Sequence, residues 1–422
     1  MNERTPGRTD HAGPARTERH VPARTDHAGP ARTERHVPAR TDHDGPARTQ
    51  EDGPARTGDG GPAAPDARFD GVLRPRPGDP AVLEALLPAP HPGDSHAASL
   101  LGLDDGDLLC AWFNGPDEGD RDTNVVLSRL PRGAGRWTAP AALSADPDRS
   151  EQNPVLAQHA DGTVWLFHPS NEPHDQTTAR LVTRTSTDGG RTWAAPRVAH
   201  EGPGVYIRNP PLDPGDGSWL LPAYRCRPGA EHSTVLISED AGAGWKEYDM
   251  AGTEGLVQPT VVRRLDGSLL GLLRSRAADR VHAVVSHDAG RTWSRPVPTE
   301  LPNNNSAVQL TRLRSGALAL VYNHASLERG EYRWVGQGAA RRKKALRTPL
   351  TLALSDDDGR TWPWRRDVQR ADDEYLETEL GYSYPALVRP RHDGRLHLAY
   401  SYLRKAVKHV SVTEDWIRQG AS

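Results

Sequence analysis

Several polar side chains stand where apolar stretches of the sequence begin. His96 and Tyr384 can exchange protons, and Arg208 carries a planar cation that suits a carboxylate. Glu377 and Glu379 immediately precede the strand expected at Tyr384, and either can accept the phenol proton, whose free pKa is about 10. Brought together, such groups suit an anionic sugar. Amide side chains complete the set, at Asn153, Asn209, Gln258, Asn304 and Asn305.

A hairpin pattern recurs along the chain and provides the elements that can position these residues. Each copy is an alternating apolar run, an Asp-Gly turn and a second apolar run, with Ser-Gly at the turn in one copy. Asp-Gly between alternating apolar strands is a strong β-hairpin signal. The sequence predicts six such hairpins, over residues 99–113, 154–167, 210–224, 259–273, 307–322 and 385–400.

A second pattern, Ser-x-Asp-x-Gly-x-x-Trp, follows most of these hairpins. Ser and Asp side chains can bond backbone N–H groups inside a turn, Gly supplies a positive φ, and Trp covers the turn. None of this requires a substrate, so we expect a structural role. Four good copies and one degenerate copy occur, at 186–193, 238–245, 286–293, 355–362 and 128–137 respectively.

The globular part of the chain is large enough for a repeat fold. All 24 aromatic residues (11 Trp, 10 Tyr, 3 Phe) lie at Phe69 or later, which leaves 422 − 68 = 354 residues for the folded body. Six hairpins then give 59 residues per unit, a suitable size for a four-stranded blade. The sequence therefore predicts an all-β protein, a six-bladed β-propeller with four-stranded antiparallel blades, over residues 67–422.

The N-terminal part is a tandem repeat of period 16, in which residues 24–39 copy residues 8–23 without a change. Pro, Gly, Arg, Thr and His dominate it, so it cannot bury enough apolar surface to offset the entropy of ordering. We expect residues 1–66 to be disordered. The histidines of the repeat lack metal-site spacing, which favours an expanded repeat over a metal-binding tail.

Composition excludes several classes of protein. The formal charge of −3, from 53 basic and 56 acidic residues, argues against nucleic-acid binding, and the sequence contains no apolar run long enough for a membrane span. Two cysteines, Cys110 and Cys226, rule out a disulfide framework.

No nucleotide- or metal-binding motif appears, so we expect no cofactor and no metal. The first residues lack a signal peptide, which predicts a cytoplasmic protein. The sequence gives no oligomeric state.

The repeats resemble the sialidase (neuraminidase) superfamily, in which the Ser/Asp/Gly/Trp turn is known as the Asp-box. The segments SHAASLLGLDDGDLLCAWF, EQNPVLAQHADGTVWLF, LPNNNSAVQL and GYSYPALVRPRHDGRLHLAYSY are similar to its bacterial BNR-repeat branch, over about residues 90–415. The resemblance implies an axial site at the starts of the innermost strands. It also implies three arginines on a substrate carboxylate, a Tyr nucleophile paired with a Glu, and an Asp acid/base.

Part of that site is present in the sequence. Tyr384, in Tyr-Pro-Ala-Leu-Val, occupies the place of the nucleophile, with Tyr382 two residues earlier. Arg274, at the end of the fourth hairpin, and Arg347, eight residues before the last Asp-box, correspond to the second and third arginines. The resemblance therefore predicts that both arginines and both tyrosines contribute to the site.

Other positions depart from the family pattern. His96 stands where the first arginine is expected, and Gln258 stands where the Glu is expected. A Gln cannot accept the proton of a tyrosine. The acid/base falls in the loop GPDEGDRD, where Asp122, Asp120 and Glu118 are the candidates. These departures put conventional sialic-acid hydrolysis in doubt.

Four functions remain open for a carbohydrate or glycoconjugate substrate. The first is retaining hydrolysis of a sialic-acid-like or uronic-acid glycoside, with Tyr384 as nucleophile and Arg208 replacing the lost arginine. The second is a uronate-type lyase, in which arginine neutralises the substrate carboxylate and Tyr384 and His96 exchange protons with it. The others are an intracellular enzyme of small-molecule biosynthesis and a non-catalytic carbohydrate-binding propeller. A basic insertion at 329–347 is a lid, an oligomer contact or a solvated loop.

Overall fold

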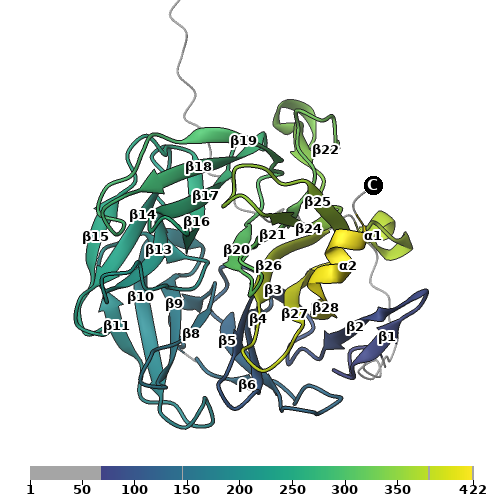
Figure 1. Ribbon diagram of the computed structural model, residues 1–422, viewed down its shortest axis with the longest axis horizontal. Helices are drawn as coiled ribbons and strands as arrows, with labels where there is room; N and C mark the ends of the chain where they lie inside the picture. Colours follow the sequence, from purple (N-terminus) through teal and green to yellow (C-terminus); the bar gives the residue numbers. More distant parts are fainter. Residues whose placement is uncertain (1–67, 145, 379–380, 421–422) are drawn as a thin grey trace, which may run out of the picture. The chain divides into compact units, whose positions relative to one another are not determined.

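Six small antiparallel sheets follow one another along the chain and form a ring (Figure 1). The structure is a computed structural model and describes residues 68–144, 146–378 and 381–420. The predicted six-bladed β-propeller is confirmed. The tail predicted for residues 1–66 lies outside the described residues.

Each blade contains four strand positions. Blade 1 consists of β3 (Asp94–Gly102), β4 (Leu108–Gly115), β5 (Asn124–Leu130) and β6 (Ala141–Ala142). In blade 2 the first position is divided into β7 (Ser150–Glu151) and β8 (Val155–Gln158), followed by β9 (Val164–Glu172), β10 (Asp175–Ser186) and β11 (Arg197–His200). Blade 3 consists of β12 (Val205–Ile207), β13 (Trp219–Arg225), β14 (His232–Ser238) and β15 (Lys246–Asp249).

The last three blades repeat this order. Blade 4 consists of β16 (Leu256–Arg263), β17 (Leu269–Ser275), β18 (Arg280–Ser286) and β19 (Val297–Pro302). Blade 5 consists of β20 (Gln309–Arg312), β21 (Leu318–Asn323), β24 (Leu350–Ser355) and β25 (Trp364–Gln369). Blade 6 contains β26 (Tyr382–Val388), β27 (Leu396–Tyr402), β28 (Ala406–Val412) and β2 (Asp79–Leu87).

The six predicted hairpins form the first two strands of the six blades. In the fourth hairpin, for example, Val261 of β16 pairs with Gly271 of β17. Every residue of β17 is buried, because a neighbouring blade packs against each of the two faces of blade 4. The strands β16, β20, β26 and β3 lie nearest the centre of the ring (Figure 1).

The ring is closed by a strand from the N-terminal side of the body. β2 pairs antiparallel with β28, so that Leu83 faces Ser411, and β1 (Arg74–Arg76) extends the same sheet. The last blade thus combines strands from both ends of the described chain. Closure covers sheet edges that would otherwise present unpaired backbone groups.

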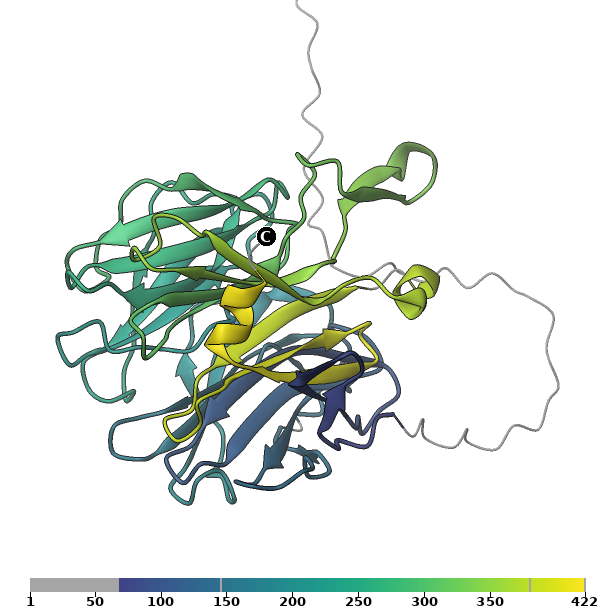
Figure 2. The ribbon, with the colours of Figure 1, turned by 45° about the vertical axis from the view of Figure 1, so that its right-hand side comes forward.

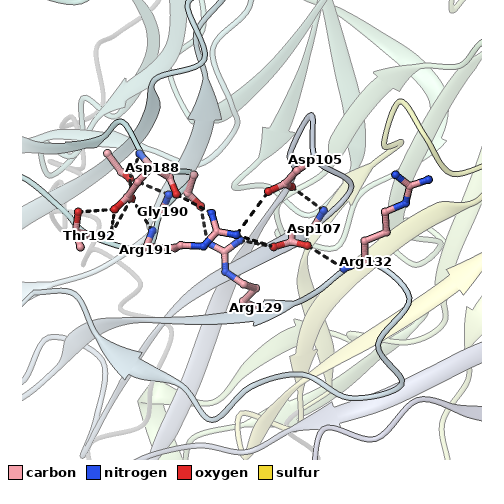
Figure 3. Close-up of polar contacts among 10 residues, drawn as sticks. Asp105, Asp107, Arg129, Arg132, Asp188, Gly190, Arg191 and Thr192 are labelled. Carbon is pink, nitrogen blue, oxygen red and sulfur yellow. Dashed lines mark hydrogen bonds and ion pairs between the residues drawn. The ribbon is translucent and has the colours of Figure 1, made fainter.

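The Asp-boxes join neighbouring blades. In the first box, Ser186 Oγ donates to Asp188 and accepts from the Gly190 N–H at 2.8 Å. Figure 3 shows Asp188 and Gly190 of this box beside Arg129 and Asp107. Gly190 has a φ of +80°, and a Cβ atom there would lie 2.9 Å from Leu109 Cδ1 of the preceding blade. Arg129 of that blade donates to the Gly189 carbonyl and to Asp107. A Cβ atom on the corresponding glycine of the other boxes would likewise meet a side chain of the preceding blade: Trp165 at Gly242, Leu220 at Gly290 and Leu270 at Gly359.

The remaining elements lie outside the six sheets. The helix α1 (Asp373–Thr378) connects blades 5 and 6, and α2 (Glu414–Gln419) follows β28. The hairpin of β22 (Tyr332–Val335) and β23 (Arg342–Ala345), with the turn η1 (Gly338–Ala340), is inserted in blade 5. None of the helices in the described ranges is long and apolar enough to cross a membrane.

Candidate functional site at the propeller axis

Non-glycine residues with positive φ recur where the first strand of a blade begins. Backbone of this kind costs about 1–3 kcal/mol per residue and is found preferentially at functional sites. In three of these strands the register with the second strand also shifts, at His96/Ser99, Val257/Thr260 and Ser383/Ala386. Such a kink interrupts the alternation of side chains between the two faces of the strand, so a side chain at the strand start can take another direction. The φ values are 58° at Ala97, 40° at Asn153, 53° at Gln258, 60° at Asn305 and 52° at Tyr384.

Three arginines surround Tyr384, which is 5 % exposed. The guanidinium carbons of Arg274, Arg208 and Arg347 lie 5.5, 5.6 and 5.7 Å from the centre of its ring. Arg274 Nη1 also donates a hydrogen bond of 2.5 Å to the phenol oxygen. The arginines come from blades 4, 3 and 5, so the ring brings together the residues predicted from distant parts of the sequence.

Arg208 holds the Tyr384 segment in place. Its Nη2 donates to the carbonyl oxygens of Tyr384 at 2.6 Å and of Pro385 at 2.9 Å. Burial lowers the pKa of Arg208 to about 10, whereas Tyr384 and Tyr224 act in the opposite direction and raise it. Its Nε has no hydrogen-bond partner among the described residues. Arg208 is therefore fixed by the backbone of the Tyr384 segment, and one of its buried N–H groups is left over.

Two amide side chains fix Arg274. Gln258 Oε1 accepts from Nη1 at 2.9 Å, and Asn305 Oδ1 accepts from Nε at 2.8 Å. The Nε2 of Gln258 donates to the phenol oxygens of Tyr224 at 3.2 Å and of Tyr384 at 3.4 Å. At the position of the family Glu, this protein therefore supplies a hydrogen-bond donor to the tyrosine.

His96 lies beside the same tyrosine. Its ring centre is 4.2 Å from that of Tyr384 and 5.5 Å from that of Phe113, and the residue is completely buried. An imidazole and a phenol in contact form a pair that can exchange protons with a substrate. The structure thus brings His96 and Tyr384 together, as the sequence analysis expected for an axial site.

The carboxylates of the blade 1 loop differ in their exposure and in their partners. Asp122 is exposed, whereas Glu118 accepts a hydrogen bond of 2.6 Å from Arg404 Nη2. Burial raises the pKa of Tyr206 well above its usual value, and the negative charge of Glu118 raises it further. Within this loop, Glu118 thus acts electrostatically on Tyr206.

Other predicted amides bind backbone groups. Asn153 Nδ2 donates to the Ile207 carbonyl at 3.3 Å, and Asn209 Nδ2 donates to the Pro259 carbonyl at 3.0 Å. Each of these bonds joins the first strand of one blade to that of the next. Asn304 Nδ2 donates at 2.7 Å to the carbonyl of Leu346, the residue before Arg347. These amides hold the strand starts and the third arginine in position.

Tyr382 does not lie beside Tyr384, and the side chains of two other predicted residues are not described. Tyr382 packs into the core of blade 6, with its ring 5.5 Å from Tyr402 and 5.6 Å from Tyr375. Glu377 belongs to α1, but its side chain is not described, and Glu379 lies outside the described residues.

Two tyrosines near the axis were not predicted. Tyr206 of β12 and Tyr224 of β13 face each other across the third hairpin. Tyr206 Oη donates to Asn171 Oδ1 at 2.6 Å, and burial raises the pKa of Tyr224 well above its usual value. Tyr224 ends the hairpin predicted over 210–224, whereas Tyr206 lies four residues before it, so the hairpin pattern marked only Tyr224.

A separate cavity of about 560 Å³ lies between blades 1 and 2. Its lining includes Arg180 and the buried His168 and Glu151, with His168 Nδ1 3.8 Å from Glu151 Oε1. It contains none of the predicted site residues. The axial cluster, with its converging arginines and tyrosines, is the better candidate for chemistry.

Comparison with known families agrees with this architecture. The family described as BNR repeat-like domain matches residues 106–398. The chain belongs to this family. The predicted membership of the sialidase superfamily and its BNR-repeat branch is confirmed with it.

Two sialidases are relatives of this BNR-repeat protein in sequence. That of Micromonospora viridifaciens is 26 % identical over 317 residues, which cover 64 % of this chain and 45 % of the relative. That of Bacteroides fragilis is 24 % identical over 218 residues, which cover 47 % and 36 %. The chain thus spans less than half the length of these two relatives.

Solved structures similar to the BNR-repeat protein share its fold. A Hadza microbial sialidase aligns with a TM-score of 0.62 and 15 % identity, over 77 % of this chain and 66 % of that one. A Dyadobacter fermentans protein of unknown function gives 0.61 and 18 %, over 79 % and 99 %. The intramolecular trans-sialidase of Ruminococcus gnavus gives 0.61 and 15 %, over 78 % and 97 %.

Proposed function

We propose that this protein cleaves a glycoside whose sugar carries a carboxylate, at the axial site centred on Tyr384. The observation that carries the proposal is the set of three guanidinium groups within 5.7 Å of the Tyr384 ring centre. Guanidinium groups bind carboxylates through two parallel hydrogen bonds, and their pairing strengthens in a site that excludes water. The sialidase relatives support a carbohydrate substrate of this class.

In the proposed reaction, hydrolysis proceeds with retention of configuration. Tyr384 Oη attacks the anomeric carbon, and the leaving oxygen takes a proton from a carboxyl group of the blade 1 loop, for which Glu118 and Asp122 are candidates. A neutral phenol suits this attack better than a carboxylate, because the sugar is itself anionic. The phenol proton passes to His96, Glu377 or Glu379. Water then releases the sugar from the tyrosine.

Arg274 has a distinct part in this proposal. Its Nη1 donates to the phenol oxygen, so it stabilises negative charge there as the proton leaves. The Nε2 of Gln258 donates to the same oxygen from 3.4 Å. In this proposal the two donors orient the phenol oxygen for attack.

Elimination from a uronate is the second candidate, and the contact between His96 and Tyr384 favours it. An arginine neutralises the carboxylate and acidifies the C5 proton. One member of the pair removes that proton, the other protonates the leaving oxygen at C4, and a C4–C5 double bond forms. This route needs no glutamate at position 258.

Analysis of products from sialosides and uronosides tests both reactions. Hydrolysis releases a saturated sugar acid, whereas elimination gives an unsaturated uronate that absorbs at the edge of the ultraviolet. Failure to form either product, together with specific binding on a glycan array, would refute turnover and support a carbohydrate-binding propeller. Turnover of internal small-molecule conjugates alone would instead support the biosynthetic alternative.

A further inference from the structure

The hairpin β22–β23 stands away from blade 5 (Figure 2). It interrupts the connection between β21 and β24. From Tyr332 to Ala345 it contains five basic residues and no acidic residue, in a chain whose formal charge is −3. The hairpin is therefore a local concentration of positive charge. The basic residues are Arg333, Arg341, Arg342, Lys343 and Lys344.

One face of the hairpin also carries aromatic rings. Trp334 pairs with Lys343 across the two strands, and Tyr332 lies two residues away on the same face. Lys343 Nζ is 4.2 Å from the ring centre of Tyr332, and the Arg341 guanidinium is 4.5 Å from that of Trp334. Trp334 is nevertheless 51 % exposed, one of only three large apolar side chains so exposed in the described residues.

The base of the hairpin is attached to the axial site. The Leu346 N–H donates to the Glu331 carbonyl at 2.9 Å, and Asn304 Nδ2 donates to the Leu346 carbonyl. The next residue, Arg347, has its guanidinium beside Tyr384. Because β21 runs antiparallel to β20, the connection after β21 leaves from the edge of the sheet where β20 starts. The hairpin therefore rises from the edge of the propeller at which the first strands start, which is the edge that carries the axial residues.

We propose that the hairpin binds the further anionic residues of a glycan chain whose carboxylated end sugar occupies the axial site. This inference rests on the proposed function, and it specifies the substrate as a polyanionic oligosaccharide. Exposed cations pair with carboxylates or sulfates along the chain, and Trp334 offers an apolar surface to a sugar ring. Each exposed charge pair contributes little, so affinity comes from several pairs acting together.

Binding to sialic-acid and galacturonic-acid oligomers of increasing length, measured by calorimetry on the full chain, tests the proposal. Affinity is expected to increase with length and to decrease with salt. The triple variant Arg341→Ser, Arg342→Ser, Lys343→Ser is expected to bind the long oligomers about tenfold more weakly and to lose the dependence on length. Trp334→Ala is expected to weaken binding severalfold.

The matched control removes three exposed arginines elsewhere, by Arg314→Ser, Arg370→Ser and Arg391→Ser. Equal affinities of the two triple variants would overturn the proposal, as would affinity independent of length. Hairpin-dependent binding of a single-stranded oligonucleotide at the same strength would identify a nucleic-acid surface instead. A change of mass in solution in the hairpin variant alone would identify a contact between copies of the chain.

The outcome is separable from that of the proposed function. The variant Tyr384→Phe keeps the hairpin, so its binding of the oligomers should still increase with length and still depend on Arg341, Arg342 and Lys343. Hairpin-dependent binding without any turnover of these oligomers would refute the catalytic proposal alone. Turnover of short substrates without hairpin-dependent binding would refute the role of the hairpin alone.

Discussion

Arg274 Nη1 donates a hydrogen bond of 2.5 Å to the phenol oxygen of Tyr384, a residue 110 positions away in the sequence. Arg274 comes from blade 4 and Tyr384 from blade 6, so the contact exists only because the blades close into a ring. Arg274 is completely buried. A cation in such surroundings acts strongly on a neighbouring oxygen, because little water screens it. In the proposed reaction, the same guanidinium would influence both the nucleophile and a substrate carboxylate.

Replacing Tyr384 by Phe is expected to reduce turnover at least 100-fold, the lower end of what one acid–base or nucleophilic group contributes. The protein should remain folded, because losing the two hydrogen bonds to the phenol oxygen costs about 2–4 kcal/mol together, less than the stability of about 5–15 kcal/mol that is typical of a folded protein. Steady-state kinetics and a thermal melt of the variant check both statements. Tyr382→Phe is the matched control, since Tyr382 lies in the core of blade 6. Full activity of the Tyr384 variant, or an equal loss in the control, would contradict the assignment.

Replacing Gln258 by Glu distinguishes the two proposed reactions. The new carboxylate would lie between Arg274 and Tyr384, where the amide now bonds to both. We expect hydrolysis to accelerate by about tenfold or more, because the tyrosine gains a base. Elimination should not accelerate, because its base is already present. Rates of both products in the variant and in the unmodified protein measure the effect, and an accelerated elimination would argue against this division of roles.

The fold was predictable because its signals are local. An Asp-Gly turn between alternating apolar residues, as around Gly267, specifies a hairpin without information from the rest of the chain. The Asp-box similarly specifies a turn from eight consecutive residues. Six copies at a suitable spacing then leave few architectures. The closing strand β2 was not assigned, because its partner β28 lies more than 300 residues away and no turn connects them.

The candidate site was predictable only in part. Tyr384, Arg274 and Arg347 followed from the family pattern, and the structure brings them together. The orientation of Gln258 did not follow, because an amide can donate or accept, and its partners decide which atom faces the tyrosine. The positive φ values at the strand starts were also not predictable, because Gln and Tyr rarely adopt them and no local sequence motif indicates them.

The contact between Asp-boxes and neighbouring blades predicts a large effect at Gly359. This residue has a φ of +85°, and a Cβ atom would lie 2.5 Å from Leu270 Cδ2 of blade 4. Gly359→Ala should reduce the free energy of unfolding by about 2–4 kcal/mol, from backbone strain and overpacking together. Chemical denaturation measures this change.

Gly316→Ala is the matched control for Gly359→Ala. Gly316 has a similar φ of +91°, but no atom lies within 4 Å of its Cβ position. Its substitution should therefore cost only the backbone strain, about 1–2 kcal/mol. Equal losses at the two glycines would show that contact with the preceding blade contributes nothing.

A buried pair of histidines in blade 6 predicts how stability depends on pH. Trp137 Nε1 donates to His409 Nδ1 at 3.3 Å, so the proton of His409 is on Nε2, which donates to His397 Nδ1 at 2.9 Å. His397 Nε2 then donates to Asp393 at 2.7 Å. Burial, with a contribution from the neighbouring His397, lowers the pKa of His409 well below its usual value. Trp137 belongs to blade 1, so the pair also takes part in closing the ring.

The sign of the effect follows from the direction of that pKa shift. Above about pH 6.5 His409 is neutral in both the folded and the unfolded chain, so it contributes no pH dependence to the free energy of unfolding. Below that pH the unfolded chain binds a proton that the folded chain does not, so the free energy of unfolding should fall by up to about 1.4 kcal/mol per pH unit. Urea denaturation between neutral pH and about pH 5 measures the slope. The slope should be smaller in His409→Gln and unchanged in His392→Gln, whose side chain is exposed. An unchanged slope in the His409 variant would show that this histidine is protonated in the folded protein as easily as in the unfolded chain.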